Sequence, residues 1–206
     1  TIPLDRREQV LQRIATNCRE GKQAYWVCTL VEQSETLDAQ AAEATYQEIK
    51  DRFPDVNIGL VHGKMKANEK QAVMQAFKDN QLQLLIATTV IEVGVDVPNA
   101  SIMVIENAER LGLSQLHQLR GRVGRGATAS FCALLYKAPL SQNGQERLSI
   151  LRESNDGFVI AEKDLKIRGP GELLGTKQAG DMGFRVVRLE RDDHLLSQAH
   201  VVAQHI

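Results

Sequence analysis

The sequence predicts an α/β fold built on a parallel sheet with helices on both faces. Short apolar runs rich in β-branched residues, AYWVCTLV over 24–31 and LQLLIATT over 82–89, are typical of strands buried on both sides. Longer segments with apolar residues at helical spacing lie between such runs, so strands and helices alternate along the chain. This alternation is typical of parallel sheets, in which ligands bind at the carboxyl ends of the strands.

The other elements follow from the same patterns. A helix is expected over 34–53, because Pro54 disfavours helical backbone in the residue before it. We expect its apolar face to comprise Leu37, Ala41, Ala44 and Ile49. Further strands are expected over 57–63, 100–108 and 130–137, and further helices over 67–79 and around 114–120.

The pattern changes after residue 140, which divides the chain into a first domain over 1–140 and a second over 141–206. Residues 144–166 predict a helical hairpin interrupted near 155–157, and 192–206 predict a C-terminal helix. The glycine-rich run KIRGPGELLGTKQAG lies between them and contains Leu173 and Leu174. A solvated linker rarely carries such leucines, so an ordered loop is favoured over a flexible linker.

Composition excludes several classes of protein. Of 206 residues, 43% are hydrophobic and 25% are charged, with 25 basic and 26 acidic side chains, which argues against a disordered chain, a collagen or a disulfide scaffold. No apolar run approaches the roughly 18 residues of a membrane helix. The three cysteines and five histidines lack metal-ligand spacing, so we expect no metal site and reduced thiols, as in the cytoplasm. The start at Thr1, without an initiator methionine, indicates processing or a piece of a longer protein.

Charge is unevenly distributed. Residues 110–152, called here the basic segment, carry seven basic side chains and one acidic, whereas 28–60 carry seven acidic and two basic. A local basic block on a nearly neutral protein indicates a polyanion site, and solvated surface arginines are the alternative.

The chain lacks the parts of a complete nucleotide-hydrolysing site. A phosphate-binding loop needs a Gly-Lys pair followed by Ser or Thr, but Gln23 and Met65 follow the two Gly-Lys pairs. No Asp-Glu dipeptide is present to bind Mg²⁺. This chain alone therefore cannot hold a triphosphate with its metal ion.

The segment QLRGRVGRG nevertheless indicates phosphate chemistry. Arg122 and Arg125 are three residues apart among glycines, which permit close approach of the backbone to a ligand. Two such arginines can contact one phosphate and stabilise the charge that develops during phosphoryl transfer. A nucleic-acid-binding loop is the alternative for this pattern.

Three segments together resemble the signature motifs of superfamily 2 helicases. LVHGKM, ATTVIEVGVDVP and QLRGRVGRG have the order and spacing found in the second RecA-like lobe of these motors. Across the whole chain the resemblance is closest to the RecG family of bacterial branched-DNA translocases. DGFVIAEKDLKIRGPGELLGTKQAG resembles the translocation motif that this family shares with the transcription-repair coupling factor, and EQSETLDAQAAEATYQEIK favours the RecG family.

The resemblance implies a RecA-like lobe that lacks the phosphate loop, followed by the hairpin, the glycine-rich loop and the C-terminal helix. It implies ATP with Mg²⁺, held mainly by a first lobe outside this chain, and branched DNA such as Holliday junctions and replication forks. A wedge domain that confers junction specificity would also lie outside the chain.

The resemblance also assigns residues. Arg122 and Arg125 would be arginine fingers, organised by Gln118, and Gly94 and Asp96 would approach the nucleotide. DNA phosphates would be bound by His62, Gly63, Lys64 and Thr88. Movement of the motor would be coupled to DNA by Arg147, Arg168 and Gln178.

Other interpretations remain open at this point. One alternative is that the chain is the equivalent lobe of the transcription-repair coupling factor. Another is a nucleic-acid-binding module that does not hydrolyse ATP, although such a module does not need two arginines three residues apart. Asp96 would merely cap a turn, His62 would be a satisfied loop histidine, and Glu106 would be solvated or paired with Arg110 or Arg120. Trp26 is expected in the core.

Overall fold

The computed structural model describes residues 1–29, 35–88, 97, 99–124 and 130–168. The chain divides into two compact units, Thr1–Ala161 and Glu162–Ile206. The sheet and its helices lie in the first unit. The domain boundary expected at residue 140 remains a prediction.

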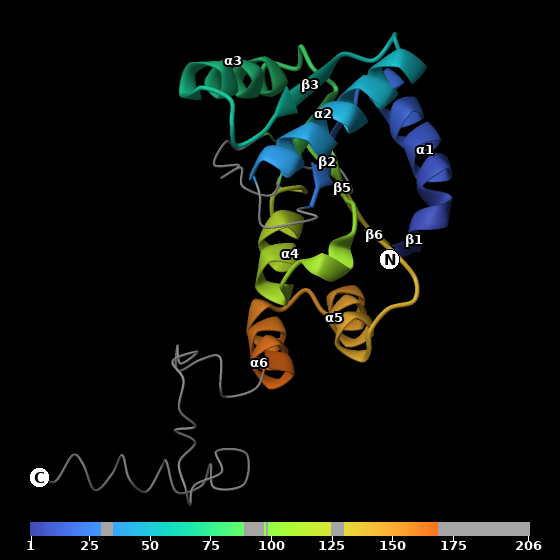
Figure 1. Ribbon diagram of the computed structural model, residues 1–206, viewed down its shortest axis with the longest axis vertical. Helices are drawn as coiled ribbons and strands as arrows, with labels where there is room; N and C mark the ends of the chain where they lie inside the picture. The colour runs from blue at the N-terminus through green and yellow to red at the C-terminus, as the bar shows by residue number, and fades with distance from the viewer. Residues whose placement is uncertain (30–34, 89–96, 98, 125–129, 169–206) are drawn as a thin grey trace, which may run out of the picture. The chain divides into compact units, whose positions relative to one another are not determined.

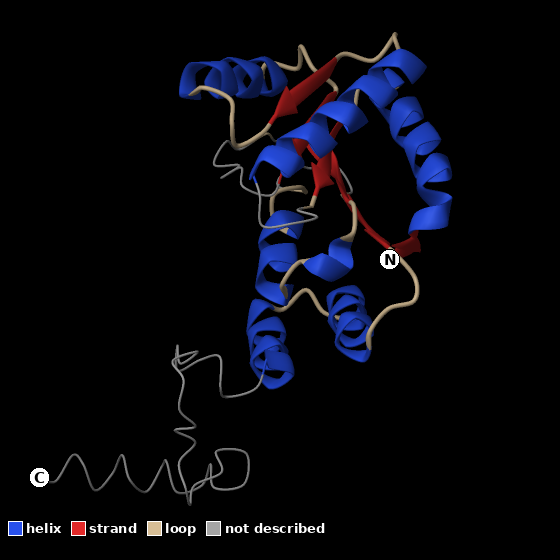
Figure 2. Cartoon of the chain, in the orientation of Figure 1, coloured by secondary structure: helices blue, strands red, loops and turns tan. Residues whose placement is uncertain are grey.

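The first unit is built on a six-stranded sheet whose paired strands are all parallel, in the order β1-β6-β5-β2-β4-β3 (Figures 1 and 2). The predicted parallel α/β class is therefore confirmed. β2, β4 and β5 are buried at every position, as strands covered on both faces must be. The strands are β1 (Ile2–Pro3), β2 (Gln23–Cys28), β3 (Ile58–Val61), β4 (Leu84–Thr88), β5 (Ala100–Ile105) and β6 (Phe131–Tyr136).

From β2 onward, helices and strands follow one another in the order expected from the sequence. Short 3-10 turns η1 (Leu4–Arg6) and η2 (Ala108–Arg110) precede α1 and α4. The hairpin expected after residue 140 is present as two helices separated by residues 154–156. The helices are α1 (Arg7–Arg19), α2 (Glu35–Arg52), α3 (Ala67–Lys78), α4 (Leu113–Arg120), α5 (Gln142–Glu153) and α6 (Gly157–Arg168).

The core has a layer on each face of the sheet because successive strand side chains alternate in direction. Trp26 is fully buried, as expected, in a cluster with residues of α1 and α2. Its neighbour Tyr25 points the other way and meets Phe77 of α3, with ring centroids 4.9 Å apart. Helices therefore cover both faces.

Two expectations about helices need correction. The sequence reasoning missed α1, although Leu11, Ile14 and Cys18 bury one face at helical spacing. The predicted apolar face of α2 was wrong at Leu37, which is 43% exposed, and at Ala44, which is also exposed, whereas Ile49 is buried as expected. Alanines lie on several sides of α2, so the sequence does not define a single apolar face. Packing on β3 and β4 determines which side is buried. The buried positions of α2 are Asp38, Ala39, Ala42 and Ile49.

None of the helices in the described part of the chain has the length and apolar character needed to cross a membrane.

Candidate nucleotide and nucleic-acid interface

The parallel strands place three loop starts at one edge of the sheet. Val61 of β3 pairs with Ala87 of β4, and Thr88 at the end of β4 pairs with Cys28 of β2. Residues that directly follow β2, β3 and β4 therefore lie at the same edge. We call His62, Gly63, Lys64 and Thr88, which are the predicted DNA contacts, the strand edge.

Two buried side chains at the strand edge have unsatisfied polar atoms. Within the described residues, Thr88 Oγ1 and His62 Nδ1 have no hydrogen-bond partner, although both residues are less than 9% exposed. His62 Nε2 lies 3.3 Å from Glu43 Oε1 of α2, so one ring nitrogen is satisfied and the other is not. Because an unpaired buried polar group costs free energy, these atoms favour an external hydrogen-bonding ligand.

The loop between β3 and α3 is held from its far end. Lys70 Nζ of α3 donates to the Gly63 carbonyl at 2.7 Å, while Lys64 is exposed. Glu69 Oε2 accepts from the Lys66 amide at 3.0 Å, so a carboxylate already occupies part of the helix N-terminus expected to bind DNA phosphate. The loop therefore presents Lys64 from a fixed backbone, with fewer free amides than the sequence suggested.

The turn after α4 carries the first predicted arginine finger. Gln118 on α4 is exposed, and Arg122 is partly buried in the turn, where its amide donates to the Leu119 carbonyl at 3.0 Å. The Arg122 side chain has no hydrogen bond or ion pair to any other residue that the structure describes. This arginine is therefore available to an external anion.

One glycine of this turn has a different role from the one expected. Gly124 has φ of +81°, and a Cβ atom there would lie 2.3 Å from Ser130 Oγ. The glycine is thus required by the backbone and by Ser130, whereas the sequence suggested close approach to a ligand. A Cβ on Gly121 would meet only ordinary contacts, the nearest at 3.5 Å.

The basic segment is less available to polyanions than its composition suggested. Arg147 of α5 donates from Nη1 to the Leu111 carbonyl at 2.9 Å and from Nη2 to the Glu109 carbonyl at 3.3 Å. Arg120 is likewise bonded to backbone carbonyls of Leu151 and Ser154. These two arginines connect elements within the protein.

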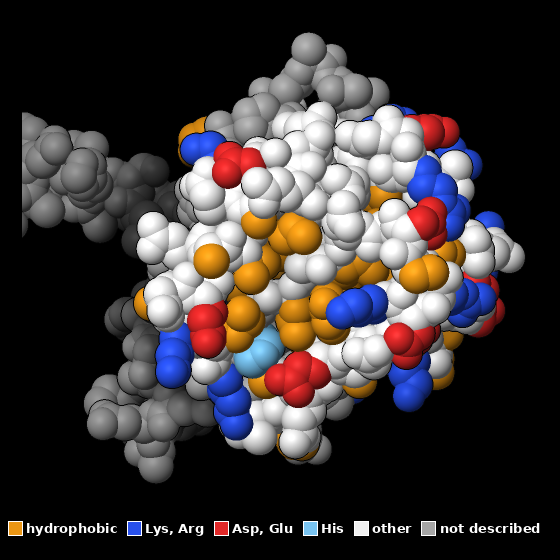
Figure 3. Space-filling model, turned by 90° about the horizontal axis from the view of Figure 1, so that it is seen from above, with side chains coloured by type: hydrophobic (Ala, Val, Ile, Leu, Met, Phe, Trp, Pro, Cys, Tyr) orange, Lys and Arg blue, Asp and Glu red, His pale blue; other side chains and the backbone are white. Residues whose placement is uncertain are grey.

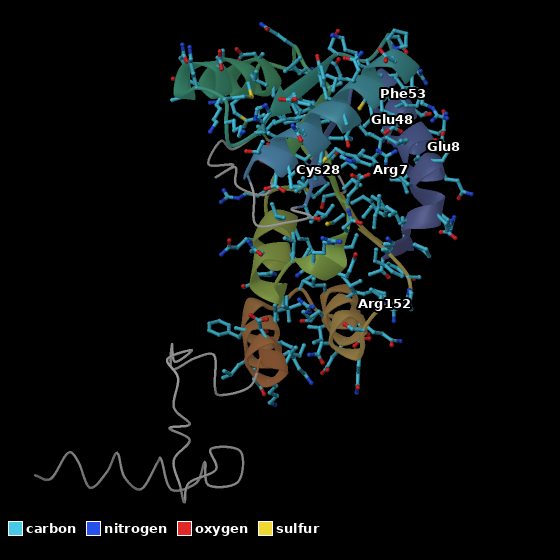
Figure 4. The ribbon with its side chains drawn as sticks, viewed as in Figure 1. Arg7, Glu8, Cys28, Glu48, Phe53 and Arg152 are labelled. Atoms are coloured by element: carbon cyan, nitrogen blue, oxygen red, sulfur yellow. The ribbon has the colours of Figure 1, made fainter. Side chains whose placement is uncertain are left out.

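Glu106, directly after β5, pairs with a residue that the sequence reasoning did not consider. Its carboxylate accepts from Arg7 Nε of α1 and is buried, so the expectation of a solvated carboxylate was wrong. Arg7 also binds Glu48 of α2 at 2.7 Å, and both residues are labelled in Figure 4. Because α1 itself was missed, no local signal pointed to this ion-pair network.

The cysteines carry no chemistry of their own. Burial raises the pKa of Cys18 and Cys28 to about 12 and that of Cys132 to about 11, which keeps all three protonated at neutral pH. Among the described residues no group of His, Cys, Asp or Glu is arranged to hold a metal ion.

Several predicted site residues lie outside the described part of the chain. These are Gly94, Asp96, Arg125 and Gln178, together with the side chain of Arg168.

On the face seen in Figure 3, acidic and basic side chains alternate around a central apolar area. This face therefore does not present the single-signed surface that binds polyanions through net charge alone.

Two family models match the chain. The helicase conserved C-terminal domain matches residues 6–127, and the C-terminal part of domain 3 of the ATP-dependent DNA helicase RecG matches residues 154–206. Together they cover strands β2 to β5, the turn after α4 and the segment that follows α5, whereas β1, β6 and α5 lie outside both matches.

Bacterial relatives align with essentially the whole chain. The ATP-dependent DNA helicase RecG of Escherichia coli strain K12 is 64% identical over 206 residues, and that of Bacillus subtilis is 48% identical over 196. The Haemophilus influenzae protein of the same name is 63% identical over 193 residues. The alignments with the Escherichia coli, Bacillus subtilis and Haemophilus influenzae proteins include 100%, 95% and 93% of this chain. They include only about 30% of the length of each relative.

Solved structures agree with the fold. A structure of RecG bound to a three-way DNA junction aligns with 95% of this chain and 25% of its own, at a TM-score of 0.72 and 43% identity. Domain 2 of the DEAD-box helicase Mss116p bound to an RNA duplex aligns with 81% of this chain and 67% of its own, at a TM-score of 0.56. At 17% identity, the latter shows the RecA-like fold alone.

Proposed function

The chain belongs to the helicase conserved C-terminal domain family, and from this premise we propose that it is the second motor lobe of an ATP-dependent double-stranded DNA translocase. The enzyme would remodel branched DNA, by migrating Holliday junctions and reversing stalled replication forks, in recombination and repair. The observation that carries this proposal is identity of 64% through all 206 residues, because motifs, hairpin and tail are then matched together. The same identity favours a RecG-type enzyme over the transcription-repair coupling factor.

In this proposal Arg122 acts on the nucleotide as an arginine finger. A partly buried arginine without a partner in the described residues is suited to charge that develops on a phosphoryl group. Gln118 would orient the motif, and Arg125, Gly94 and Asp96 would complete the surface that faces the nucleotide.

The residues present fit ATP and Mg²⁺ only as half of a site. The chain lacks a phosphate loop and an Asp-Glu pair, so the first lobe would hold the nucleotide and metal, and ATP hydrolysis would drive movement. This lobe contributes the arginine that contacts the transferring phosphate.

The strand edge would hold DNA phosphates. Lys64 would supply positive charge from the fixed loop after β3, while the Thr88 hydroxyl would donate a hydrogen bond to a phosphate oxygen and His62 would lie beside it. Contacts of this kind position a protein on DNA without reading its sequence, as a translocase requires. Arg147, Arg168 and Gln178 would couple DNA movement to the motor. We expect the enzyme to act in the cytoplasm.

The test uses the full-length protein with forked DNA. Arg122→Ala and Arg125→Ala should each lower DNA-stimulated turnover by about 10³-fold while ATP binding changes little, because a finger acts in the transition state. Arg122→Lys should not restore turnover, since a point charge cannot replace the planar fork. The 206-residue chain alone should not hydrolyse ATP.

A matched control is Arg152→Ala, which removes another arginine of the basic segment whose side chain is 67% exposed. This variant should keep normal turnover (its place on α5 is marked in Figure 4). Near-normal turnover in Arg122→Ala would contradict the finger assignment, and absence of DNA-stimulated hydrolysis in the wild type would contradict the proposed function.

A further inference from the structure

The turn after β5 contains an asparagine in an uncommon backbone conformation. Asn107 has φ of 47° and ψ of 45°, in the left-handed region that most residues with a side chain avoid. Among the described residues, Asn80 is the only other non-glycine residue with a positive φ. Asparagine tolerates this region, but glycine adopts it without steric cost. The backbone alone would be served better by glycine, so the Asn107 side chain should have a use of its own.

The two asparagines differ in what their side chains contact. Asn80 Oδ1 lies 3.5 Å from Asn99 Nδ2, so the Asn80 side chain has a neighbour within the protein. The Asn107 side chain is partly buried and forms no hydrogen bond with any other residue that the structure describes. It also does not cap the 3-10 turn η2 that follows it. The Asn107 amide group is therefore available to an external ligand.

The backbone of this turn is held without help from the Asn107 side chain. The Asn107 carbonyl accepts from the Arg110 amide at 3.0 Å and from Thr29 Oγ1 at 3.3 Å. The Glu106 amide, one residue earlier, donates to the Val27 carbonyl of β2 at 2.9 Å. Because several bonds share this work, the side chain extends from a fixed backbone.

Asn107 lies at the same edge of the sheet as the strand edge. Ile105, the last residue of β5, pairs with Val27 of β2. The next residue of β2, Cys28, pairs with Thr88 of β4. The carboxyl ends of β5, β2 and β4 are therefore adjacent, with β2 in the middle. Because neighbouring strands lie about 4.8 Å apart, the exit of β5 is about 10 Å from the exit of β4.

The spacing and the chemistry fit a DNA backbone. One DNA strand advances by about 3.4 Å per nucleotide, so about 10 Å covers about three nucleotides. Asparagine is among the side chains that contact DNA phosphates, because its amide group can donate two hydrogen bonds. The two neighbouring carboxylates have partners within the protein, since Glu106 pairs with Arg7 and Glu109 accepts from the Lys137 amide at 3.3 Å.

We propose that Asn107 is a DNA-binding residue. Its Nδ2 would donate to a backbone phosphate about three nucleotides from the phosphate bound at Thr88, on the same DNA strand. The DNA-binding surface would then extend from the ends of β3 and β4 to the end of β5. Because the amide is neutral, this contact would position the DNA without releasing a counterion and without reading its sequence. This inference rests on the proposed function.

The experiment measures binding of the full-length protein to forked DNA, without ATP and at several salt concentrations. Asn107→Gly removes the side chain and suits the left-handed backbone, so the urea unfolding midpoint should not fall. DNA affinity should fall by about 10-fold, because one hydrogen bond to a charged group is lost. The slope of log affinity against log salt should stay unchanged, because no charge is removed.

Asn107→Asp separates the donor from the shape of the side chain. Aspartate also tolerates a positive φ, but it replaces the donating amide group by an acceptor with a negative charge. DNA affinity should therefore fall further than in Asn107→Gly, while the urea unfolding midpoint stays close to that of the wild type.

The matched control is Asn80→Gly. It makes the same change at the other left-handed asparagine, which lies between α3 and β4 at the opposite edge of the sheet. This variant should leave DNA affinity unchanged.

A scan of single methylphosphonate groups along the forked DNA, each removing one phosphate charge, maps the contact. Asn107→Gly should be insensitive to replacement of one phosphate that the wild type senses. That phosphate should lie about three nucleotides from the one to which Thr88→Val is insensitive.

The outcomes separate the two proposals. Wild-type affinity in Asn107→Gly would overturn the inference and leave the proposed function in place. Equal losses in Asn107→Gly and Asn80→Gly would also overturn it, because the loss would then not depend on the edge of the sheet. Sensitivity of Asn107→Gly to every phosphate that the wild type senses would do the same. A wild-type protein that does not bind forked DNA would overturn the proposed function and the inference together.

Discussion

The strand edge and the contacts of Arg120 with the end of α5, called here the α4–α5 joint, differ in whether their polar groups have hydrogen-bond partners. At the strand edge, two buried polar atoms, Thr88 Oγ1 and His62 Nδ1, lack partners in the described part of the chain. At the joint, the Arg120 guanidinium reaches two carbonyl oxygens and a ring nitrogen. The described residues supply partners for the Arg120 guanidinium, whereas they supply none for these two atoms of the strand edge.

The contrast is sharpest between two arginines of one motif. Arg120 is bonded to α5, whereas Arg122 has no partner among the described residues. Composition counts both as basic, but one stabilises a contact between helices and the other is open to an anion. A charged motif therefore need not act on a ligand with all its charges.

The largest expected effect concerns the backbone between the two regions. Gly124→Val forces a β-branched residue into positive φ against Ser130, so the free energy of unfolding should fall by about 1–3 kcal/mol or more. Urea denaturation of the 206-residue chain measures this loss. Gly121→Ala, three residues earlier and with ordinary contacts only, should be neutral or stabilise by up to about 1 kcal/mol. Equal losses in both variants would contradict the geometry of the turn.

A smaller effect is expected from the exposed charge at the strand edge. Lys64→Ala in the full-length protein should weaken binding to branched DNA and reduce the slope of log affinity against log salt by about 1. Lys78→Ala removes an exposed lysine from the far end of α3 and should change neither quantity. An unchanged salt slope in Lys64→Ala would mean that this lysine does not contact phosphate.

The smallest change in stability is expected where a polar atom lacks a partner. Thr88→Val removes an unpaired hydroxyl, so the free energy of unfolding should stay within about 1 kcal/mol of wild type while DNA affinity falls. The matched variant is Thr29→Val, directly after the neighbouring strand β2, where Thr29 Oγ1 donates to the Asn107 carbonyl at 3.3 Å. Loss of that bond should cost about 1 kcal/mol without changing DNA affinity. If Thr88→Val proved the more destabilising of the two, its hydroxyl would have an internal partner.

The sequence determined the features that depend on local spacing. Alternating apolar runs and helical segments predicted the parallel sheet, the hairpin after residue 140 and the placement of the motifs at strand ends. The sequence also placed Trp26 in the core, where it is fully buried. These inferences succeeded because the spacing of apolar residues along a short segment differs between strands and helices.

The tertiary structure decided which of these local features meet. Strand register brought Thr88 level with the end of β2, and packing on the sheet selected the buried face of α2. Arg7 was unrecognised because its partners, Glu48 and Glu106, are 41 and 99 residues away in sequence. Arg120 was read as basic surface because spacing along the chain does not show that the end of α5 lies beside it. Contacts between distant segments depend on how helices and strands pack. The spacing of apolar residues along one segment does not predict which other segment packs against it.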